Sequence, residues 1–393
     1  MSGWPTKALG DLCEITIGKT PPRNVPRYWG QGHAWLSIAD MGQGRVLRRT
    51  KESITPAAVQ DGVSGRLVPP GTVLLSFKLS IGKLGIAAVP LYTNEAIAAL
   101  AIRDAGKLSP EYLLHALAAA DLQARTDRAV MGMTLNKAKM QRLRVPLPPL
   151  PEQRRIAAIL DKADAVRRKR QQTLALADQF LRSAFLDMFG DPVTNPKRWP
   201  IKKLGDLAET KLGKMLSKAS LRGENPVEYL GNSNVRWREF DLSSLATMDF
   251  TADELKKLDV QDGDLLVCEG GEVGRCAIWR GERPGISFQK ALHRVRCHPG
   301  ALVPEYLQEL LMLMAETGAL VGATSTATIA HLTGVRLKQL RIPVPPVALQ
   351  MEFVGEYRVQ RSLRMRLTHT ANLVQGLRES LTRRAFQGEL AGV

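Results

Sequence analysis

The sequence predicts an α+β protein: two tandem α/β domains joined by two long antiparallel coiled-coil helices, with an internal pseudo-twofold repeat. Three observations predict this fold class. Blocks of residues recur in the same order in both halves of the 393-residue chain. Each half contains strand-like apolar runs and helix-like amphipathic segments. A proline-rich segment and a long heptad pattern then follow in each half.

The internal repeat consists of five blocks whose offsets all fall between 192 and 197 residues. Trp4–Leu12 returns as Trp199–Leu207, and Gly18-Lys19 returns as Gly213-Lys214. The other pairs are Pro70–Leu75 with Asp262–Val267, Leu108–Leu113 with Leu302–Leu307, and Leu143–Pro149 with Leu340–Pro346. Because the blocks keep one order and nearly one spacing, we interpret the chain as two fused and diverged copies of one domain.

Each copy contains a predicted strand followed by a predicted helix. A glycine turn before an apolar run is typical of a buried strand, and such runs occur at Gly71–Phe77 and Gly263–Cys268. A Pro-Glu-Tyr-Leu segment then begins an amphipathic helix, expected from Pro110 to about Asp121 and from Pro304 to about Glu316.

The Pro-x-Pro-Pro segments at 146–149 and 343–346 end the two domains, because they can continue neither a helix nor a central strand. The expected divisions are a first globular domain at 1–150, a central long helix at 151–190, a second globular domain at 191–347 and a C-terminal long helix at 348–393.

The long helices are expected from about Glu152 to Met188 and from about Met351 to Gln387, each roughly 55 Å at 1.5 Å per residue. The predicted heptad seam contains Ile156, Ile159, Ala163, Val166, Arg170, Thr173, Ala177, Phe180 and Ala184 in the first helix, and Phe353, Gln360, Leu363, Leu367, Thr370, Val374, Leu377 and Leu381 in the second. One small domain cannot bury so long a stripe, so we expect the helices to pack on each other as a coiled-coil spacer. An ordinary helical bundle is the alternative.

Charge and composition narrow the function. The 55 Lys and Arg residues exceed the 38 Asp and Glu residues by 17, which favours a polyanionic partner. Aromatic residues make up only 5%, which disfavours an extensive stacking platform for single strands. The sequence contains no apolar stretch of about 18–20 residues, no secretory signal and only four scattered cysteines. We therefore expect a cytoplasmic protein without membrane contact.

Motifs for catalysis and metal binding are incomplete. Gly18-Lys19-Thr20 resembles the end of a phosphate-binding loop, but Cys13 stands where that loop needs glycine. His293, Cys297 and His298 lack the fourth ligand that a zinc site needs. The chain has neither a nucleophile elbow nor the Asn-Pro-Pro-aromatic motif of an amino-methyltransferase. We expect no catalytic residue, no metal ligand and no enzymatic activity in this chain.

Polar and basic side chains in loop-rich stretches are candidate DNA contacts. Arg, Asn, Gln and Lys read base edges, whereas Ser, Thr and Lys mostly bind phosphates. The candidates are Arg23, Arg27, Gln31, His33, Lys78, Lys83, Thr134, Asn136 and Lys137 in the first half, and Asn232, Asn234, Arg236, Arg275, Thr324, Ser325 and Thr326 in the second. For any one of them, a solvated surface residue is the alternative.

Two segments carry a resemblance to a known family. Pro-Leu-Pro-Pro-Leu-Pro-Glu-Gln at 146–153, leading into Arg154–Asp161, resembles the specificity subunit of type I restriction-modification systems, as does Arg383–Leu390. The second copy departs from this pattern at 345–352, where Gln350 remains but the Glu-Gln pair is out of register. This departure affects only the start of the second long helix.

The resemblance implies a protein that binds double-stranded DNA through two target recognition domains, each reading half of a split sequence. The partners would be two modification (methyltransferase) subunits and restriction/translocase subunits. S-adenosylmethionine, ATP and Mg²⁺ would bind to those partners, and this chain would hold no cofactor. The two halves differ most in the candidate readout stretches, which predicts an asymmetric bipartite target. The alternative is a basic coiled-coil scaffold that binds an acidic protein.

Overall fold

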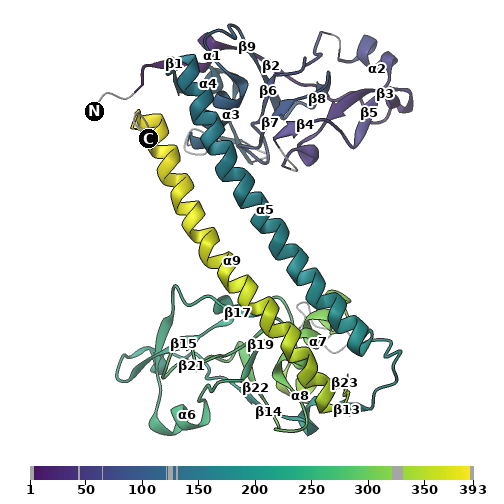
Figure 1. The fold of residues 1–393 in the computed structure, drawn as a ribbon, viewed down its shortest axis with the longest axis vertical. Coiled ribbons are helices and arrows are strands. Elements are labelled where there is room, and N and C mark those ends of the chain that lie inside the picture. The colour runs from purple at the N-terminus through teal and green to yellow at the C-terminus, as the bar shows by residue number, and fades with distance from the viewer. Residues whose placement is uncertain are drawn as a thin grey trace. The chain divides into compact units, whose positions relative to one another are not determined.

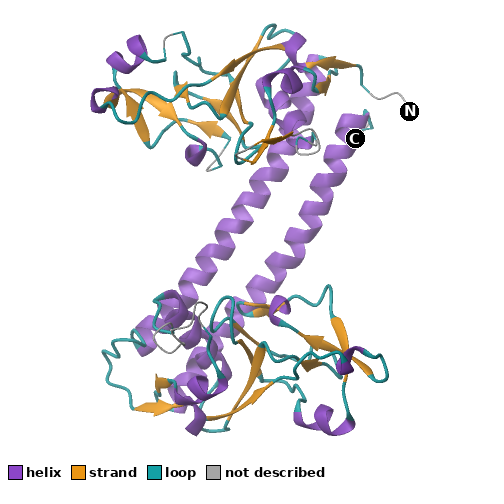
Figure 2. Ribbon diagram, turned by 180° about the vertical axis from the view of Figure 1, so that it is seen from behind, coloured by secondary structure: helices purple, strands orange, loops and turns teal. Residues whose placement is uncertain are grey.

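The computed structural model describes residues 4–42, 45–63, 65–120, 122, 127–129, 132–320 and 331–389. The chain divides into two compact units, Met1–Arg170 with His369–Val393, and Gln171–Thr368 (Figure 1). Both units contain strands and helices (Figure 2), and both include part of each long helix. The predicted fold class is confirmed.

The first unit contains two sheets. The larger has the strand order β2 (Cys13–Ile17), β9 (Ile97–Ile102), β6 (Val73–Ser76), β7 (Leu84–Ala87) and β4 (Val46–Leu47). The smaller has the order β5 (Glu52–Ile54), β3 (Trp29–Leu36) and β8 (Tyr92–Thr93). Two-stranded pairs join β1 (Thr6–Ala8) to β12 (Arg144–Pro146), and β10 (Asp127–Ala129) to β11 (Gly132–Thr134). The short helices are α1 (Leu9–Leu12), η1 (Pro26–Tyr28), η2 (Ile38–Asp40), α2 (Pro56–Asp61), α3 (Pro110–Ala119) and α4 (Lys137–Gln141).

The second unit repeats this framework. Its larger sheet has the order β14 (Ala208–Leu212), β22 (Leu292–Cys297), β19 (Leu265–Cys268) and β20 (Cys276–Ile278). Its three-stranded sheet has the order β18 (Ala246–Asp249), β15 (Pro226–Leu230) and β21 (Ser287–Phe288). The two-stranded pairs are β13 (Ile201–Lys203) with β23 (Arg341–Pro343), and β16 (Val235–Arg236) with β17 (Glu239–Phe240). The short helices are η4 (Leu204–Asp206), η5 (Ala219–Leu221), η6 (Asn232–Asn234), α6 (Ala252–Lys257), α7 (Pro304–Glu316) and α8 (Gly334–Gln339).

The predicted strands and helices within each copy are confirmed. All residues of β6 and β19 are buried, as expected for apolar runs in the middle of a sheet. The Ser109 side chain caps the start of α3 by accepting a hydrogen bond from the Tyr112 N–H (3.1 Å). Tyr112 and its counterpart Tyr306 are fully buried, and each hydroxyl donates to a proline carbonyl, of Pro146 and Pro343 respectively (both 2.8 Å).

The repeated Gly-Lys block is a structural feature. A Cβ atom on Gly18 would lie 2.2 Å from the carbonyl oxygens of Thr93 and Asn94, and one on Gly213 would lie 2.4 Å from the Gln289 oxygen. The N–H of the following lysine donates to the neighbouring backbone in each copy, from Lys19 to Thr93 and from Lys214 to Phe288. Glycine is therefore required for the close approach of two backbone segments.

A buried glutamine closes each proline-rich segment. Gln153 accepts from the Ser109 N–H (3.0 Å) and donates to the carbonyls of Lys107 (2.7 Å) and Pro148 (2.9 Å). Gln350 accepts from the Val303 N–H (2.9 Å) and donates to the Pro345 carbonyl (2.8 Å). Gln350 is thus the equivalent of Gln153, and the second long helix begins normally at Val347.

The two long helices are α5 (Leu150–Phe189) and α9 (Val347–Gln387), as predicted. The predicted seam was wrong at Val166, Phe180 and Leu377, whose exposed fractions are 44%, 58% and 57%. Polar residues take inward positions instead. Asp164 is 1% exposed and pairs with the Arg378 Nε atom at 2.8 Å. Because its charge is paired, Asp164 can occupy a buried position, whereas the hydrophobic pattern assigned the inward positions to apolar residues.

One arginine from each globular domain is held between the short and long helices. Arg45 contacts His115 of α3 (Nη1–Nε2, 2.7 Å) and Asp161 of α5 (2.8 Å). Arg238 donates to Glu309 of α7 (Nε–Oε1, 2.5 Å) and to Asp178 of α5 (2.9 Å). Burial acts to lower the pKa of Arg238, but bonding to Glu309 and the charge of Asp178 outweigh it and keep the pKa above its usual range.

Candidate nucleic-acid interface

The smaller sheet of the first unit presents four candidate residues on or beside β3. The stretch expected to be loop-rich is irregular before η1, but its second part, Trp29–Leu36, forms this eight-residue strand. The Arg23 guanidinium lies 3.8 Å from the Trp29 ring centroid and pairs with Glu52 through Nη2 and Oε2 (3.0 Å). Arg27 pairs with Asp61 at 3.0 Å. Both arginines are exposed, but intramolecular partners already fix their orientations.

Gln31 occupies a β-bulge. The register between β3 and β5 shifts between Trp29 and His33, so the segment that contains Gln31 is left out of the ladder. Gly30 and Gly32 flank it with φ angles of 148° and 157°, and a Cβ on Gly32 would lie 2.4 Å from the Ile54 oxygen. The Gln31 side chain is exposed and forms no hydrogen bond with the part of the chain that the structure describes. Such a bulge directs a side chain away from the sheet.

His33 is exposed two residues further along the strand. Its ring packs edge-on against Tyr92 on β8, with the centroids 5.7 Å apart. Beneath this surface lies a small core that includes Trp35 and Ile54. Gln31 and His33 thus extend from a rigid support, and both carry groups that can hydrogen-bond a base edge.

The turn between β6 and β7 holds the next two candidates. Lys83 donates to the Ile38 carbonyl (3.2 Å), which links this turn to η2. The Lys78 ammonium lies 5.5 Å from the Phe77 ring centroid. Between them, Leu79 is 73% exposed with a φ of 62°, an unusual conformation for leucine. Sequence reasoning missed Leu79, and its only signal was an apolar residue inside a polar turn.

The candidates before the first proline-rich segment lie on other elements. Thr134 belongs to β11, and its side chain is outside the described residues. Asn136 caps α4 by accepting from the Lys139 N–H (2.9 Å). Lys137 is exposed and faces a groove beside β2, together with Arg103. The structure therefore does not join Asn136 and Lys137 to the β3 group.

In the second unit, the expectation that Asn234 is available to DNA is wrong. Asn234 is 7% exposed, accepts from the Gly231 N–H (2.9 Å) and donates to the carbonyls of Asp241 and Ser244 (both 3.0 Å). All its hydrogen-bonding groups thus serve to close this loop.

Asn232 and Arg275 are brought together. Arg275 donates to the Asn232 carbonyl (2.9 Å) and pairs with Glu272 (3.1 Å), while Asn232 donates to the Gly270 carbonyl (3.3 Å). Arg236 is exposed, 3.7 Å from Asp241. Thr324, Ser325 and Thr326 lie outside the described residues. Met215 and Leu216 are also exposed in this unit and were not predicted.

His293, Cys13 and Cys268 could serve metal binding or nucleophilic chemistry by residue type, but they are buried. The His293 ring contacts the Leu332 carbonyl (3.1 Å), and burial lowers the pKa of this histidine. Burial also raises the pKa of Cys13 to about 12 and the pKa of Cys268 to about 11, so both thiols are protonated at neutral pH. Among the described residues, no three His, Cys, Asp or Glu side chains are grouped as metal ligands, and no helix is long and apolar enough to cross a membrane.

Comparison with known proteins gives a consistent family match. The family model of the type I restriction modification DNA specificity domain matches residues 1–176 and 196–354. The MjaIX specificity subunit of Methanocaldococcus jannaschii is 27% identical over 242 residues, which cover 56% of this chain and 55% of the relative. The EcoKI specificity subunit of Escherichia coli is 25% identical over 280 residues, covering 65% and 60% respectively. The chain thus spans less than two thirds of the length of these relatives.

Solved structures share the fold. The S subunit of a type I restriction-modification system from M. genitalium superimposes with a TM-score of 0.60 at 12% identity, covering 98% of this chain and 96% of the other. A chain from a study of complex assembly in the type I system gives a TM-score of 0.53 at 17% identity, with 99% of each chain covered.

Proposed function

Because the chain belongs to the family of the type I restriction modification DNA specificity domain, we propose that it is the sequence-specific DNA-binding subunit of such a system. It would recognise an asymmetric bipartite sequence and direct catalytic partner subunits to it. The observation that carries the proposal is the duplication. The same sheet framework occurs twice, and each copy presents different exposed side chains.

The asymmetry of the target follows from the differences between the copies. The first presents Gln31 and His33 on a bulged strand, whereas its counterpart β15 pairs with β18 without a register shift. The second presents Arg236, Met215 and Leu216. Two such surfaces would read different bases, since amide, imidazole, guanidinium and apolar groups contact different base edges.

The long helices would set the spacing and carry the partners. A 40-residue helix is about 60 Å long at 1.5 Å per residue, enough to span the roughly 34–36 Å between successive major-groove sites on one face of a duplex. Leu176 and Phe180 lie one turn apart on α5 and are 64% and 58% exposed. We place contacts with two modification subunits there, and restriction/translocase subunits would complete the assembly.

In this proposal, the partner subunits carry out the catalytic steps. They would bind S-adenosylmethionine, ATP and Mg²⁺, this chain would bind none of them, and the assembly would act on cytoplasmic DNA. The named relatives are specificity subunits, which supports a directing role.

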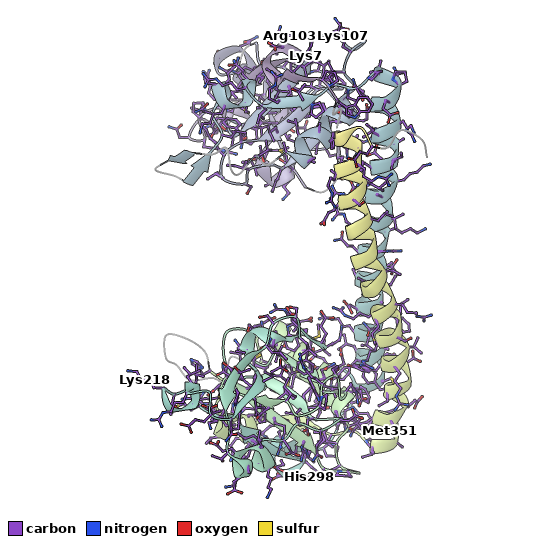
Figure 3. The ribbon with its side chains drawn as sticks, turned by 90° about the vertical axis from the view of Figure 1, so that its left-hand side faces the viewer. Lys7, Arg103, Lys107, Lys218, His298 and Met351 are labelled. Atoms are coloured by element: carbon purple, nitrogen blue, oxygen red, sulfur yellow. The ribbon has the colours of Figure 1, made fainter. Side chains whose placement is uncertain are left out.

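The decisive experiment maps methylated adenines in cells that express this chain with its modification partners. The expected result is one asymmetric bipartite motif with a fixed spacer. A Gln31→Ala variant should relax one position of one half-site, while Lys218→Ala, at a surface position of the second unit (Figure 3), should leave the motif unchanged. Methylation without a bipartite motif would contradict the proposal. Capture of an acidic protein, without sequence-selective duplex binding, would favour the scaffold alternative.

A further inference from the structure

An open strand edge lies beside a polar groove in the first unit. β2 is the outermost strand of the five-stranded sheet, opposite β4. A groove of about 750 Å³ follows β2 over residues 13–17. Arg66, Arg103, Lys137 and Gln141 line it, and Glu14 contributes one carboxylate.

The pairing register identifies the backbone groups that face the groove. The Arg103 N–H donates to the Leu12 carbonyl and the Gly18 N–H donates to the Ile97 carbonyl, so residues 12, 14, 16 and 18 bond toward β9. Cys13, Ile15 and Ile17 therefore direct their N–H and C=O groups outward. The Cys13 N–H bonds to Leu9, and Arg66 donates to the Ile17 carbonyl. Among the described residues, no partner is found for the carbonyl and N–H of Ile15 or for the N–H of Ile17. Cys13 is 1% exposed, so its unpaired carbonyl is covered, whereas Ile15 (4%) and half-buried Ile17 border the groove.

The first copy carries more positive charge than the second. Residues 1–149 contain 19 Lys and Arg against 10 Asp and Glu, a net charge of +9. Residues 191–346 contain 21 against 19, a net charge of +2. The second unit has the same edge strand in β14. There His298 and Gly334 replace Arg103 and Lys137, and Lys338 replaces Gln141, so two cations are lost and one is gained. Figure 3 shows Arg103 at the surface of its unit on the side that also presents Lys7 and Lys107.

We propose that the β2 edge is a docking site for an extended acidic segment of a partner protein, which adds to the sheet as a further strand. The unpaired ladder groups of Ile15 and Ile17 would supply main-chain hydrogen bonds where they border the groove, and Arg66, Arg103 and Lys137 would select acidic side chains. A nucleic-acid backbone fits less well. Phosphates can accept hydrogen bonds from the unpaired N–H groups of Ile15 and Ile17, but they offer no donor to the carbonyl of Ile15. The site is distinct from the β3 surface, so the proposal does not depend on DNA recognition.

The test uses the full chain and a fluorescein-labelled octapeptide of alternating Glu and Val, followed by fluorescence anisotropy. The wild-type chain should bind this probe and should not bind the corresponding octapeptide of alternating Lys and Val. The Arg103→Glu/Lys137→Glu double variant should bind about tenfold more weakly, equivalent to about 1.4 kcal/mol for two surface charges. The control, Lys218→Glu/Lys256→Glu, carries the same net charge and alters exposed positions of the second unit. It should bind within about twofold of the wild type, since its charges lie away from the groove.

Hydrogen exchange locates the bound probe independently of any substitution. The peptide should slow exchange of the Ile15 and Ile17 amides and leave the Thr210 and Leu212 amides on the β14 edge unchanged. Absence of probe binding, equal affinity of the two double variants, or protection elsewhere would each overturn the proposal. Equal protection of Ile15 and Ile17 by a DNA duplex would also overturn it, since the groove would then be a nucleic-acid surface.

Discussion

Removing the Arg238 guanidinium should strongly destabilise the second unit. Its side chain is 6% exposed and pairs with Glu309, which is 2% exposed. In an Arg238→Met variant, the Glu309 carboxylate would remain buried without its cation. Removing one partner of a buried ion pair lowers the free energy of unfolding by about 3–5 kcal/mol. With a urea m value of about 2 kcal/mol/M, the unfolding midpoint should fall by about 1.5–2.5 M.

A second substitution separates the loss of the pair from the loss of packing. In Arg238→Met/Glu309→Leu both charges are gone, while Asp178 keeps Gln360 (2.7 Å) and Arg364 (3.1 Å) as partners. Because a buried ion pair and a hydrophobic pair are often nearly equivalent, the double variant should recover to within about 1 kcal/mol of the wild type.

The assay is urea unfolding of the full chain, with hydrogen exchange of α7 and β20 as the local readout. Arg182→Met is the matched control, since Arg182 pairs with Glu316 in the same unit but is 47% exposed. It should cost less than about 1 kcal/mol. Equal destabilisation by Arg238→Met and Arg182→Met, or a double variant as unstable as Arg238→Met, would refute the reasoning.

Four further outcomes are expected. Exchanging residues 1–145 for another recognition domain should change one half-site in methylation mapping and preserve the other; a change in both would contradict independent reading. Inserting four residues after Gln171 and four after Thr368, near the Arg170–Thr370 hydrogen bond, adds about 6 Å to each helix and should lengthen the spacer by about one or two base pairs. Gln153→Ala should cost about 1–3 kcal/mol in urea unfolding by leaving the buried Ser109 N–H unpaired, whereas exposed Gln172→Ala should cost almost nothing. Burial and then the charge of Arg45 lower the pKa of His115, although Asp161 acts to raise it. Below about pH 6.5, His115 therefore binds a proton more readily in the unfolded chain than in the folded one. The free energy of unfolding should fall as the pH drops through that value. Titrated unfolding should show a smaller drop in His115→Gln, and an unchanged profile would argue against this contribution.

The order of elements could be predicted from the sequence because its signals are local. Pro304 begins α7 and Glu316 ends it, as expected, since proline fits the first turn of a helix and the segment is amphipathic. The long helix α5 begins at Leu150, directly after the Pro-Pro pair, rather than at Glu152. Proline spacing and apolar periodicity are sufficient for such assignments.

The inward face of the long helices could not be predicted in full. Asp164 is buried and pairs with Arg45 of the globular domain and Arg378 of the other long helix, and a one-dimensional pattern records no such pairing. Val166 and Leu377, two residues that the pattern placed inside, are exposed.

The candidate site was predicted by residue type. Type alone does not distinguish a side chain that contacts a base from one whose hydrogen bonds hold a loop closed. Asn234 and Gln31 are both amides, yet one closes a turn while the other extends from a bulge. The difference lies in backbone geometry around Gly30 and Gly32, which requires knowledge of the strand opposite.

The core of the first unit has a consequence for synthesis on the ribosome. Ala385 is fully buried in it, and the Phe386 ring lies 5.7 Å from that of Tyr112. These residues emerge about 237 positions after Pro149, which corresponds to about 12–47 s at 5–20 residues per second. For that interval the nascent first domain exposes apolar surface that the end of α9 covers in the folded chain. Its final folding step must therefore wait until the second domain has been translated.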